Sequence, residues 1–191
     1  QVLAERATRS ITTDEKESHW LIAPGGRMVV LDPAANLRFP IYTCNLGAFR
    51  VEVRQVGAED WPAFARGPFR RASLPGRLVM SRTLQTKGRP DEMVETMVDL
   101  APALPSGFGQ LIVFAEAVGI PVLERPLLPS EPWEPRRAVT WVQATRIGLD
   151  AFSDGDSLLA WTTSLEDGRP LSGVDVSLAG DNAMVIGMAA A

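Results

Sequence analysis

The stretch Phe49-Arg50-Val51-Glu52-Val53-Arg54 alternates apolar and charged residues without interruption. Alternation with period two indicates a β-strand, because successive side chains of a strand point to opposite faces of its sheet. The pattern places Phe49, Val51 and Val53 on one buried face and the charged side chains in solvent. It therefore predicts a strand that contributes one face to a packed core.

Similar runs surround this strand. Residues 57–64 suit a single helical turn or tight loop, with Trp61 and Phe64 capping the core. The other candidate strands are residues 28–31, 39–45, 78–84, 93–100 and 110–117. About six or seven short strands separated by turn-rich gaps are typical of a β-sandwich. The fold class predicted for the chain is therefore all-β, built from antiparallel sandwiches of the immunoglobulin or fibronectin-III kind.

A proline-rich segment, residues 119–137, interrupts the strand pattern. It holds five prolines, which are Pro121, Pro126, Pro129, Pro132 and Pro135. Proline lacks a backbone donor, so a central strand cannot run through this segment, and we interpret it as an extended linker between domains.

Strands resume at residues 139–145, and the turn dipeptides Asp154-Gly155 and Asp167-Gly168 separate further apolar runs. Asp-Gly between alternating runs is a strong hairpin signal. This second unit supplies only about four strands, fewer than a full sandwich needs. The predicted organisation is a leader or the end of a preceding domain (1–24), a first sandwich (25–118), a linker (119–137) and the N-terminal part of a second sandwich (138–191).

The composition excludes several classes of protein. Hydrophobic residues make up 46% and charged residues 22% of the 191 residues, which indicates a globular chain. The net charge of -4 argues against nucleic acid as a main partner. No apolar run is long enough to span a bilayer. Cys44 is the single cysteine, so an internal disulfide is impossible, and we expect a half-buried strand to hold it as a small hydrophobe.

No motif for chemistry emerges from the residues. His19 is the single histidine, too few for a zinc site rich in His and Cys, and it lies in a polar leader. The run starting at Asp154 resembles a calcium loop, but its twelfth position is Leu165 rather than Glu. The acidic pairs fall at strand ends or turns, where solvated carboxylates are normal; they are Glu59-Asp60, Asp91-Glu92 and Glu166-Asp167. We therefore predict no catalytic, cofactor-binding or metal-binding residue, no cofactor and no enzymatic activity.

Two segments carry a resemblance to a known family. Residues 141–152 lead through Asp154-Gly155-Asp156 into 159–176, which follows the pattern W-x-T-x-L-x-x-G-x-P-x-x-G-x-x-V. This resembles the opening of a macroglobulin-like domain of the bacterial alpha-2-macroglobulin family. Pieces upstream, at 31–39, 51–56 and 59–64, resemble the preceding domain of such proteins. The tail 181–191 departs from the strand pattern of the family.

The resemblance implies tandem macroglobulin-like sandwiches, the second incomplete, that form the scaffold of a periplasmic protease trap, often anchored by a lipid. In such proteins a bait segment is cleaved, and a thioester in another domain captures the peptidase. The thioester motif is Cys-x-Glu-Gln, whereas Cys44 precedes Asn45-Leu46-Gly47, so no thioester role is carried onto Cys44. The implied partners are neighbouring macroglobulin-like domains and, through the whole protein, target peptidases.

A second function stays open at this point. Tandem sandwiches also serve as adhesion or carbohydrate-binding modules at cell surfaces, which would require coplanar exposed aromatic rings or a loop calcium site. Trp141 and Trp161 lie among apolar residues of candidate strands, so we expect both side chains in a core.

Overall fold

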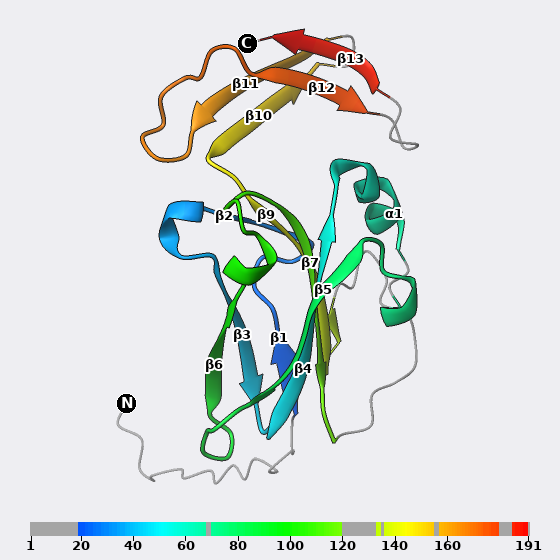
Figure 1. Cartoon of the computed structure of the whole chain (residues 1–191), viewed down its shortest axis with the longest axis vertical. Helices are drawn as coiled ribbons and strands as arrows, with labels where there is room; N and C mark the ends of the chain where they lie inside the picture. Colours follow the sequence, from blue (N-terminus) through cyan, green and yellow to red (C-terminus); the bar gives the residue numbers. More distant parts are fainter. Residues whose placement is uncertain are drawn as a thin grey trace, which may run out of the picture.

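The computed structural model describes residues 19–67, 70–119, 133–134, 136–154, 157–179 and 185–190. These residues form mostly β-strands, arranged as a larger unit and a smaller one above it in Figure 1. The strands of the first unit are β1 (Trp20–Ile22), β2 (Met28–Leu31), β3 (Arg38–Cys44), β4 (Ala48–Val56), β5 (Arg77–Gln85), β6 (Met93–Asp99), β7 (Gly109–Ala117), β8 (Trp133–Glu134) and β9 (Arg137–Ala144). Its helical elements in that part are α1 (Trp61–Arg66) and the 3-10 turns Pro33–Ala35, Ala58–Asp60, Arg71–Ser73 and Ala101–Ala103.

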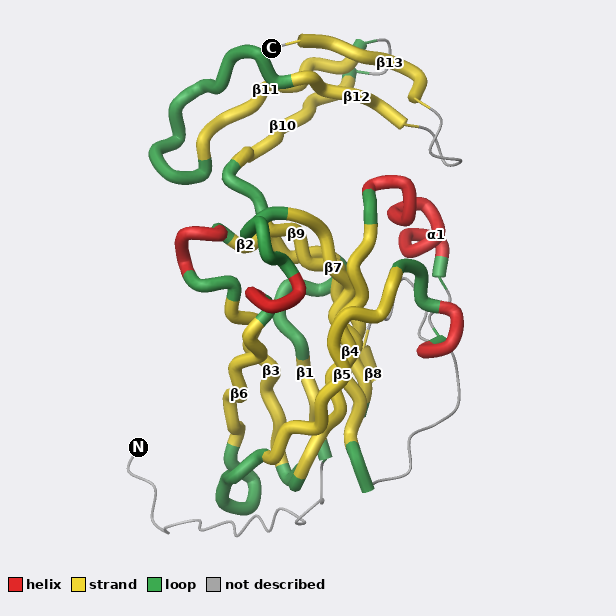
Figure 2. Tube along the Cα trace, in the orientation of Figure 1, coloured by secondary structure: helices red, strands yellow, loops and turns green. Residues whose placement is uncertain are grey.

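Two sheets form the first unit (Figure 2). The larger sheet has the order β2-β9-β7-β4-β5, with β8 also paired to β9, and the smaller sheet has the order β1-β3-β6. The pairs are antiparallel except β2 with β9, which run parallel with Met28 opposite Trp141. The all-β sandwich predicted for this region is confirmed.

The core lies between the two sheets. Phe49, Val51 and Val53 of β4 are each 0% exposed and belong to the same cluster as Phe39 and Ile41 of β3. The apolar face predicted from the alternation is therefore confirmed, since period-two spacing places these three side chains on one side of the strand.

Glu52 departs from that prediction. It is only 3% exposed, although we expected the charged residues of this strand in solvent. The turn Arg71–Ser73 supplies a partner for it, because Arg71 Nε donates to Glu52 Oε1 at 2.8 Å. A buried carboxylate needs such a partner, and sequence spacing alone gave no sign of an arginine nineteen residues away.

The outer face of the larger sheet is also covered. Trp61 and Phe64 of α1 pack on Trp141 of β9, with ring centroids 5.2 Å and 5.3 Å from it. Leu74, Ile112, Phe114 and Val139 complete this second cluster. Strands covered on both faces read as nearly continuous apolar runs rather than as alternations. The helical turn predicted near Trp61 is confirmed, and it caps this outer cluster.

The strand β9 corrects the predicted organisation. We expected residues 139–145 to open the second sandwich, but β9 lies inside the first sheet, with Ile112 of β7 opposite Trp141 and β2 on its other edge. The proline-rich segment therefore joins two neighbouring antiparallel strands of one sheet, and its end contributes β8. Proline excludes a central strand, but that argument does not separate a linker between domains from a long connection within one sheet.

The predicted leader needs a similar correction. Residues 1–18 lie outside the described part, but β1 within the predicted segment 1–24 is a strand of the smaller sheet. Its Leu21 is 0% exposed and belongs to the inter-sheet core. The strand has only three residues, too few for period two to stand out from a polar surrounding.

The second unit consists of two hairpins. β10 (Ile147–Ser153) pairs with β11 (Leu158–Ser164), and β12 (Asp175–Ala179) pairs with β13 (Val185–Ala190). The hairpin predicted around Asp154 is confirmed, although residues 155–156 are not described. Gly168 adopts φ 72°, as expected for the second turn. The segment directly after it, rather than β12, meets β11 through the bridge between Thr163 and Pro170 and a hydrogen bond from the backbone N–H of Leu171 to the carbonyl of Thr162 at 2.9 Å.

Candidate functional site

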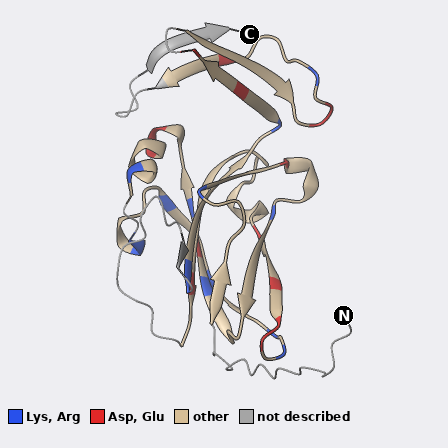
Figure 3. Cartoon of the chain, turned by 180° about the vertical axis from the view of Figure 1, so that it is seen from behind, with Lys and Arg blue, Asp and Glu red and all other residues tan. Residues whose placement is uncertain are grey.

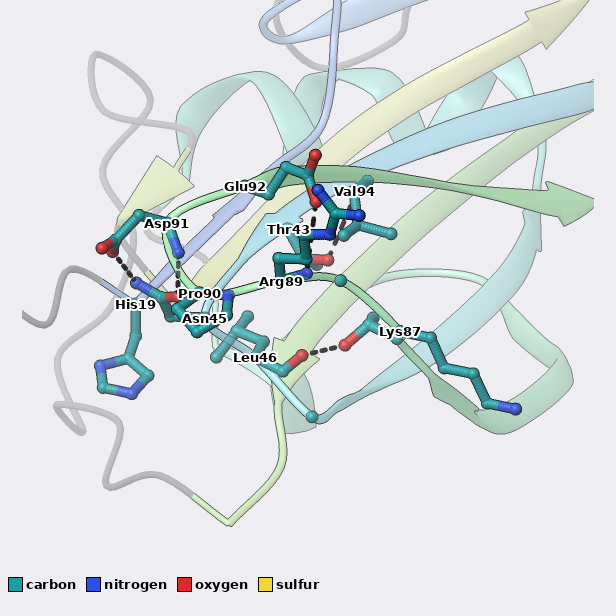
Figure 4. Close-up of a pocket in the computed structure, with 13 residues that line it drawn as sticks. His19, Thr43, Asn45, Leu46, Lys87, Arg89, Pro90, Asp91, Glu92 and Val94 are labelled. Atoms are coloured by element: carbon teal, nitrogen blue, oxygen red, sulfur yellow. Dashed lines mark hydrogen bonds between the residues drawn. The ribbon is translucent and has the colours of Figure 1, made fainter.

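The first candidate site is a pocket of about 470 Å³ at the end of the sandwich away from the second unit. His19, just before β1, lines it together with the β3–β4 turn and the connection between β5 and β6 (Figure 4). The turn contributes residues 45–47 and the connection residues 86–92. Sequence patterns do not reveal this pocket, because its walls come from three separate segments.

Hydrogen bonds between the two loops close the floor of the pocket. Asn45 Nδ2 donates to Asp91 Oδ1 at 2.7 Å, and the backbone N–H of Asp91 donates to Asn45 Oδ1 at 2.8 Å. Both residues have positive φ, 55° and 61°, a region that Asn and Asp tolerate better than most residues. The reciprocal bonds satisfy the side chains that would otherwise be free to bind a ligand.

The remaining charged groups of the pocket do not converge. The backbone N–H of Arg89 donates to Glu92 Oε2 at 3.3 Å. In Figure 4 the Lys87 side chain extends away from the other lining residues, and the His19 ring points away from Asn45 and Asp91. This arrangement stabilises the junction of two loops and offers no aligned pair of acid and base.

The other residues weighed in the sequence lie apart from one another. Cys44 ends β3, is partly exposed, and lies on the strand as predicted. Asp60 Oδ2 accepts from the backbone N–H of Gly57 at 3.1 Å, while Asp167 forms an ion pair with Arg169 at 3.4 Å. Within the described residues, no three His, Cys, Asp or Glu side chains lie close enough to hold a metal ion. No helix in that part is both long and apolar enough to cross a membrane.

Among the described residues, the large apolar side chains with the highest exposed fractions lie in the second unit. Leu159 is 61% exposed, Leu149 58% and Phe152 57%. Trp161 is 46% exposed and its ring lies 5.3 Å from that of Phe152, so the prediction that Trp161 is a core residue is wrong for the described structure, whereas Trp141 is 1% exposed as predicted. Register places Leu149 and Phe152 on opposite faces of the β10–β11 hairpin, so both faces are apolar.

A two-residue connector joins the two units. The backbone N–H of Thr145 donates to the carbonyl of Leu31 at 3.2 Å, and that of Leu165 donates to the carbonyl of Arg146 at 2.9 Å. The Arg146 guanidinium lies over the Phe108 ring, 5.6 Å from its centroid. Together these contacts attach the second unit to the loops at one end of the first.

Comparison with known proteins gives structural neighbours only. No protein-family model and no curated sequence matches the chain. A crystal structure of native Escherichia coli alpha-2-macroglobulin spanning domains NIE-MG1 has 16% identity and a TM-score of 0.64, covering 92% of this chain and 84% of that one. A structure spanning MG0-NIE-MG1 has 20% identity and a TM-score of 0.63, covering 95% of this chain and 57% of that one.

A structure of Salmonella alpha-2-macroglobulin mutant Y1175G has 17% identity and a TM-score of 0.56. It is matched over 95% of this chain, which spans only 10% of that protein's length. At such identities the likeness concerns the fold. The chain therefore has a macroglobulin-like β-sandwich fold, similar to that of these bacterial alpha-2-macroglobulin structures.

Proposed function

We propose that this chain is a structural part of a bacterial alpha-2-macroglobulin-type endopeptidase inhibitor, with a scaffold role and no bait or thioester. The observation that carries the proposal is the simultaneous match of both units, 92% of the chain, to a single two-domain structure. A shared single sandwich would be weak evidence, because that fold supports many functions. Two unlike units in the same order are a more specific feature.

The exposed side chains of the second unit support the scaffold role. Leu149 and Phe152 project from opposite faces of one hairpin, and a hairpin alone does not bury them. Further layers of a complete sandwich would cover such faces, as two stacked sheets do in the first unit. In this proposal the first unit corresponds to NIE and the second to the opening of MG1, with the boundary at Thr145–Arg146.

The remaining parts of the proposal follow from the same assignment. The partners of the chain are neighbouring macroglobulin-like domains, and target peptidases are met only through the whole inhibitor. The compartment is periplasmic or otherwise outside the cytoplasm. The chain itself performs no catalysis.

Inhibition assays test this function. Trypsin is incubated with a molar excess of the 191-residue chain or of the complete gene product, and cleavage of a large protein and of a small chromogenic substrate is then followed. We expect the chain to protect neither substrate, and the complete product to protect the large one only. Inhibition by the chain alone contradicts the scaffold role, and failure of the complete product to protect contradicts the trap.

One observation bears on the adhesion or carbohydrate alternative. Phe152 and Trp161 are exposed neighbours, but their rings are inclined at 33° and are not coplanar. Leu159, directly opposite Phe152 on the same face, is 61% exposed, so the surface is aliphatic as well as aromatic. Such a mixture fits an uncovered core better than a sugar-stacking platform.

A further inference from the structure

The strand β5 forms an open edge of the larger sheet. It is hydrogen bonded to β4, from Ala48 opposite Gln85 to Gln55 opposite Arg77, and to no other strand of the described residues. An edge strand leaves every second backbone N–H and C=O without a partner, which makes it a template for another strand. A register shift next to Arg54 disturbs one end of β5, and the regular edge runs from Met80 to Gln85.

Arg82 is the one charged side chain on the regular part of this edge, and the segment around it is basic. Residues 70–90 contain six basic and no acidic side chains, which are Arg70, Arg71, Arg77, Arg82, Lys87 and Arg89. Arg71 is engaged with Glu52, and Arg77 donates to Gln55 Oε1 at 2.6 Å. Arg82 and Lys87 form no ion pair or side-chain hydrogen bond with any described residue. Figure 3 shows the blue Lys and Arg segments concentrated in the first unit, whereas the second unit is mainly acidic.

The charge decides between possible occupants of the edge. A second copy pairing β5 with β5 would bring the Arg82 side chains of the two strands near each other, and like charges directly opposite are destabilising. No proline lies between Arg77 and Gln85, so the backbone remains able to pair. We propose that the open edge of β5 binds an acidic, extended segment of a partner protein by strand addition, with Arg82 contacting a carboxylate of that segment.

Fluorescence anisotropy tests this with the 191-residue chain and a labelled peptide, Glu-Val-Glu-Val-Glu-Val-Glu. Main-chain pairing supplies affinity and the acidic side chains supply selection, so the peptide binds and its Lys-Val analogue does not. N-methylation of alternate residues keeps the charge but removes one row of N–H donors, and we expect it to abolish binding. Arg82→Glu weakens binding about fivefold, because an attraction becomes a repulsion at an exposed site.

Arg169→Glu is the matched control, since it changes the net charge equally but lies in the second unit, where the side chain is 84% exposed. This variant leaves binding unchanged. Equal binding of the N-methylated peptide overturns strand addition, and equal loss in both variants overturns the location. Absence of peptide binding overturns the proposal outright. The proposal is also overturned if sedimentation shows a dimer of the chain that Arg82→Glu dissociates. In that case a second copy would occupy the edge with its own β6, which carries Glu95 and Asp99. None of these readouts depends on the role in a protease trap.

Discussion

Arg71 holds the carboxylate of Glu52, the most deeply buried acidic group described in the structure, across the outer face of β4. The pair links the connection after α1 to the centre of the larger sheet. Hydrogen bonding to the carboxylate raises the pKa of Arg71, and the charge of Glu52 acts in the same direction. The guanidinium therefore stays charged throughout the range in which the protein is folded, and its loss leaves Glu52 buried without a partner.

Arg71→Ala is expected to lower the free energy of unfolding by about 1–2 kcal/mol. Breaking a fully buried pair costs more, but the Arg71 side chain is 42% exposed and solvent screens part of the interaction. Denaturant unfolding measures the change. Arg82→Ala, with no partner to lose among the described residues, should stay within about 0.5 kcal/mol of the parent. Adding Glu52→Gln to Arg71→Ala should restore part of the loss; equal stability of the two arginine variants would refute the role given to the pair.

Val51→Asp should unfold the first unit. Val51 is 0% exposed between the sheets, and burying a carboxylate there costs several kcal/mol even with Arg82 opposite it on the exposed edge strand, so the cost approaches the stability of a marginal domain, roughly 5 kcal/mol. Val30→Asp is the matched control, because Val30 is 49% exposed on β2. Circular-dichroism melting distinguishes them, and a Val51→Asp melt like that of the control would show that the inward face of β4 is misassigned.

The titration of Tyr42 offers a spectroscopic test of the smaller sheet. A side-chain hydrogen bond to Glu95, its neighbour across β3 and β6, raises the pKa of Tyr42 above its usual 10.0, with desolvation and the charge of Glu95 acting in the same direction. The folded state thus binds the phenolic proton more tightly than the unfolded state. The resulting stabilisation is present below the usual pKa and is lost as pH rises through the raised one.

Phenolate absorbance reports this residue alone, because Tyr42 is the single tyrosine of the chain. Glu95→Ala should move the midpoint down towards 10.0, and Glu92→Ala should leave it in place. A parent midpoint at the usual value would contradict the pairing of Tyr42 with Glu95.

Phe108→Ala should loosen the second unit without unfolding the first. The contact with Arg146 contributes about 0.5–1 kcal/mol at an exposed site, enough to hold an orientation but not a fold. Spin labels at Ser81→Cys and Ser172→Cys, in a Cys44→Ser background, would give a broader distance distribution in the variant. Phe152→Ala, away from the connector, should keep the parent distance distribution. An unchanged distribution in Phe108→Ala would contradict the proposed role of the Arg146–Phe108 contact in holding the second unit.

The sequence was informative where structure is local. Alternation placed Phe49, Val51 and Val53 in the core, and Asp-Gly dipeptides located the turns of the second unit. It failed for long-range pairing. The parallel pairing of β2 with β9 places Met28 opposite Trp141, and no pattern in either segment predicts that the two strands pair. The pocket between Asn45 and Asp91 was missed for the same reason, because two distant loops form it.

The position of β9 gives the sharpest test of the revised organisation. A fragment of residues 19–145 contains every described strand of both sheets of the first unit and should unfold cooperatively. A fragment of residues 25–118, the boundaries predicted from sequence, lacks Leu21, Trp141 and Val142, each at most 1% exposed. Each such side chain contributes about 1.5–3 kcal/mol through burial, so losing three removes most of the 5–15 kcal/mol typical of a domain.

The shorter fragment also opens the edge of β7 that β9 covers, and uncovers Phe64 on the outer face. Exposed edges and apolar surface promote aggregation. We therefore expect the 19–145 fragment to give a single denaturant transition and the 25–118 fragment to be insoluble or to lack one. If the shorter fragment unfolded cooperatively with comparable stability, β9 would be dispensable to the first sheet, and the proline-rich segment would again be a linker between domains.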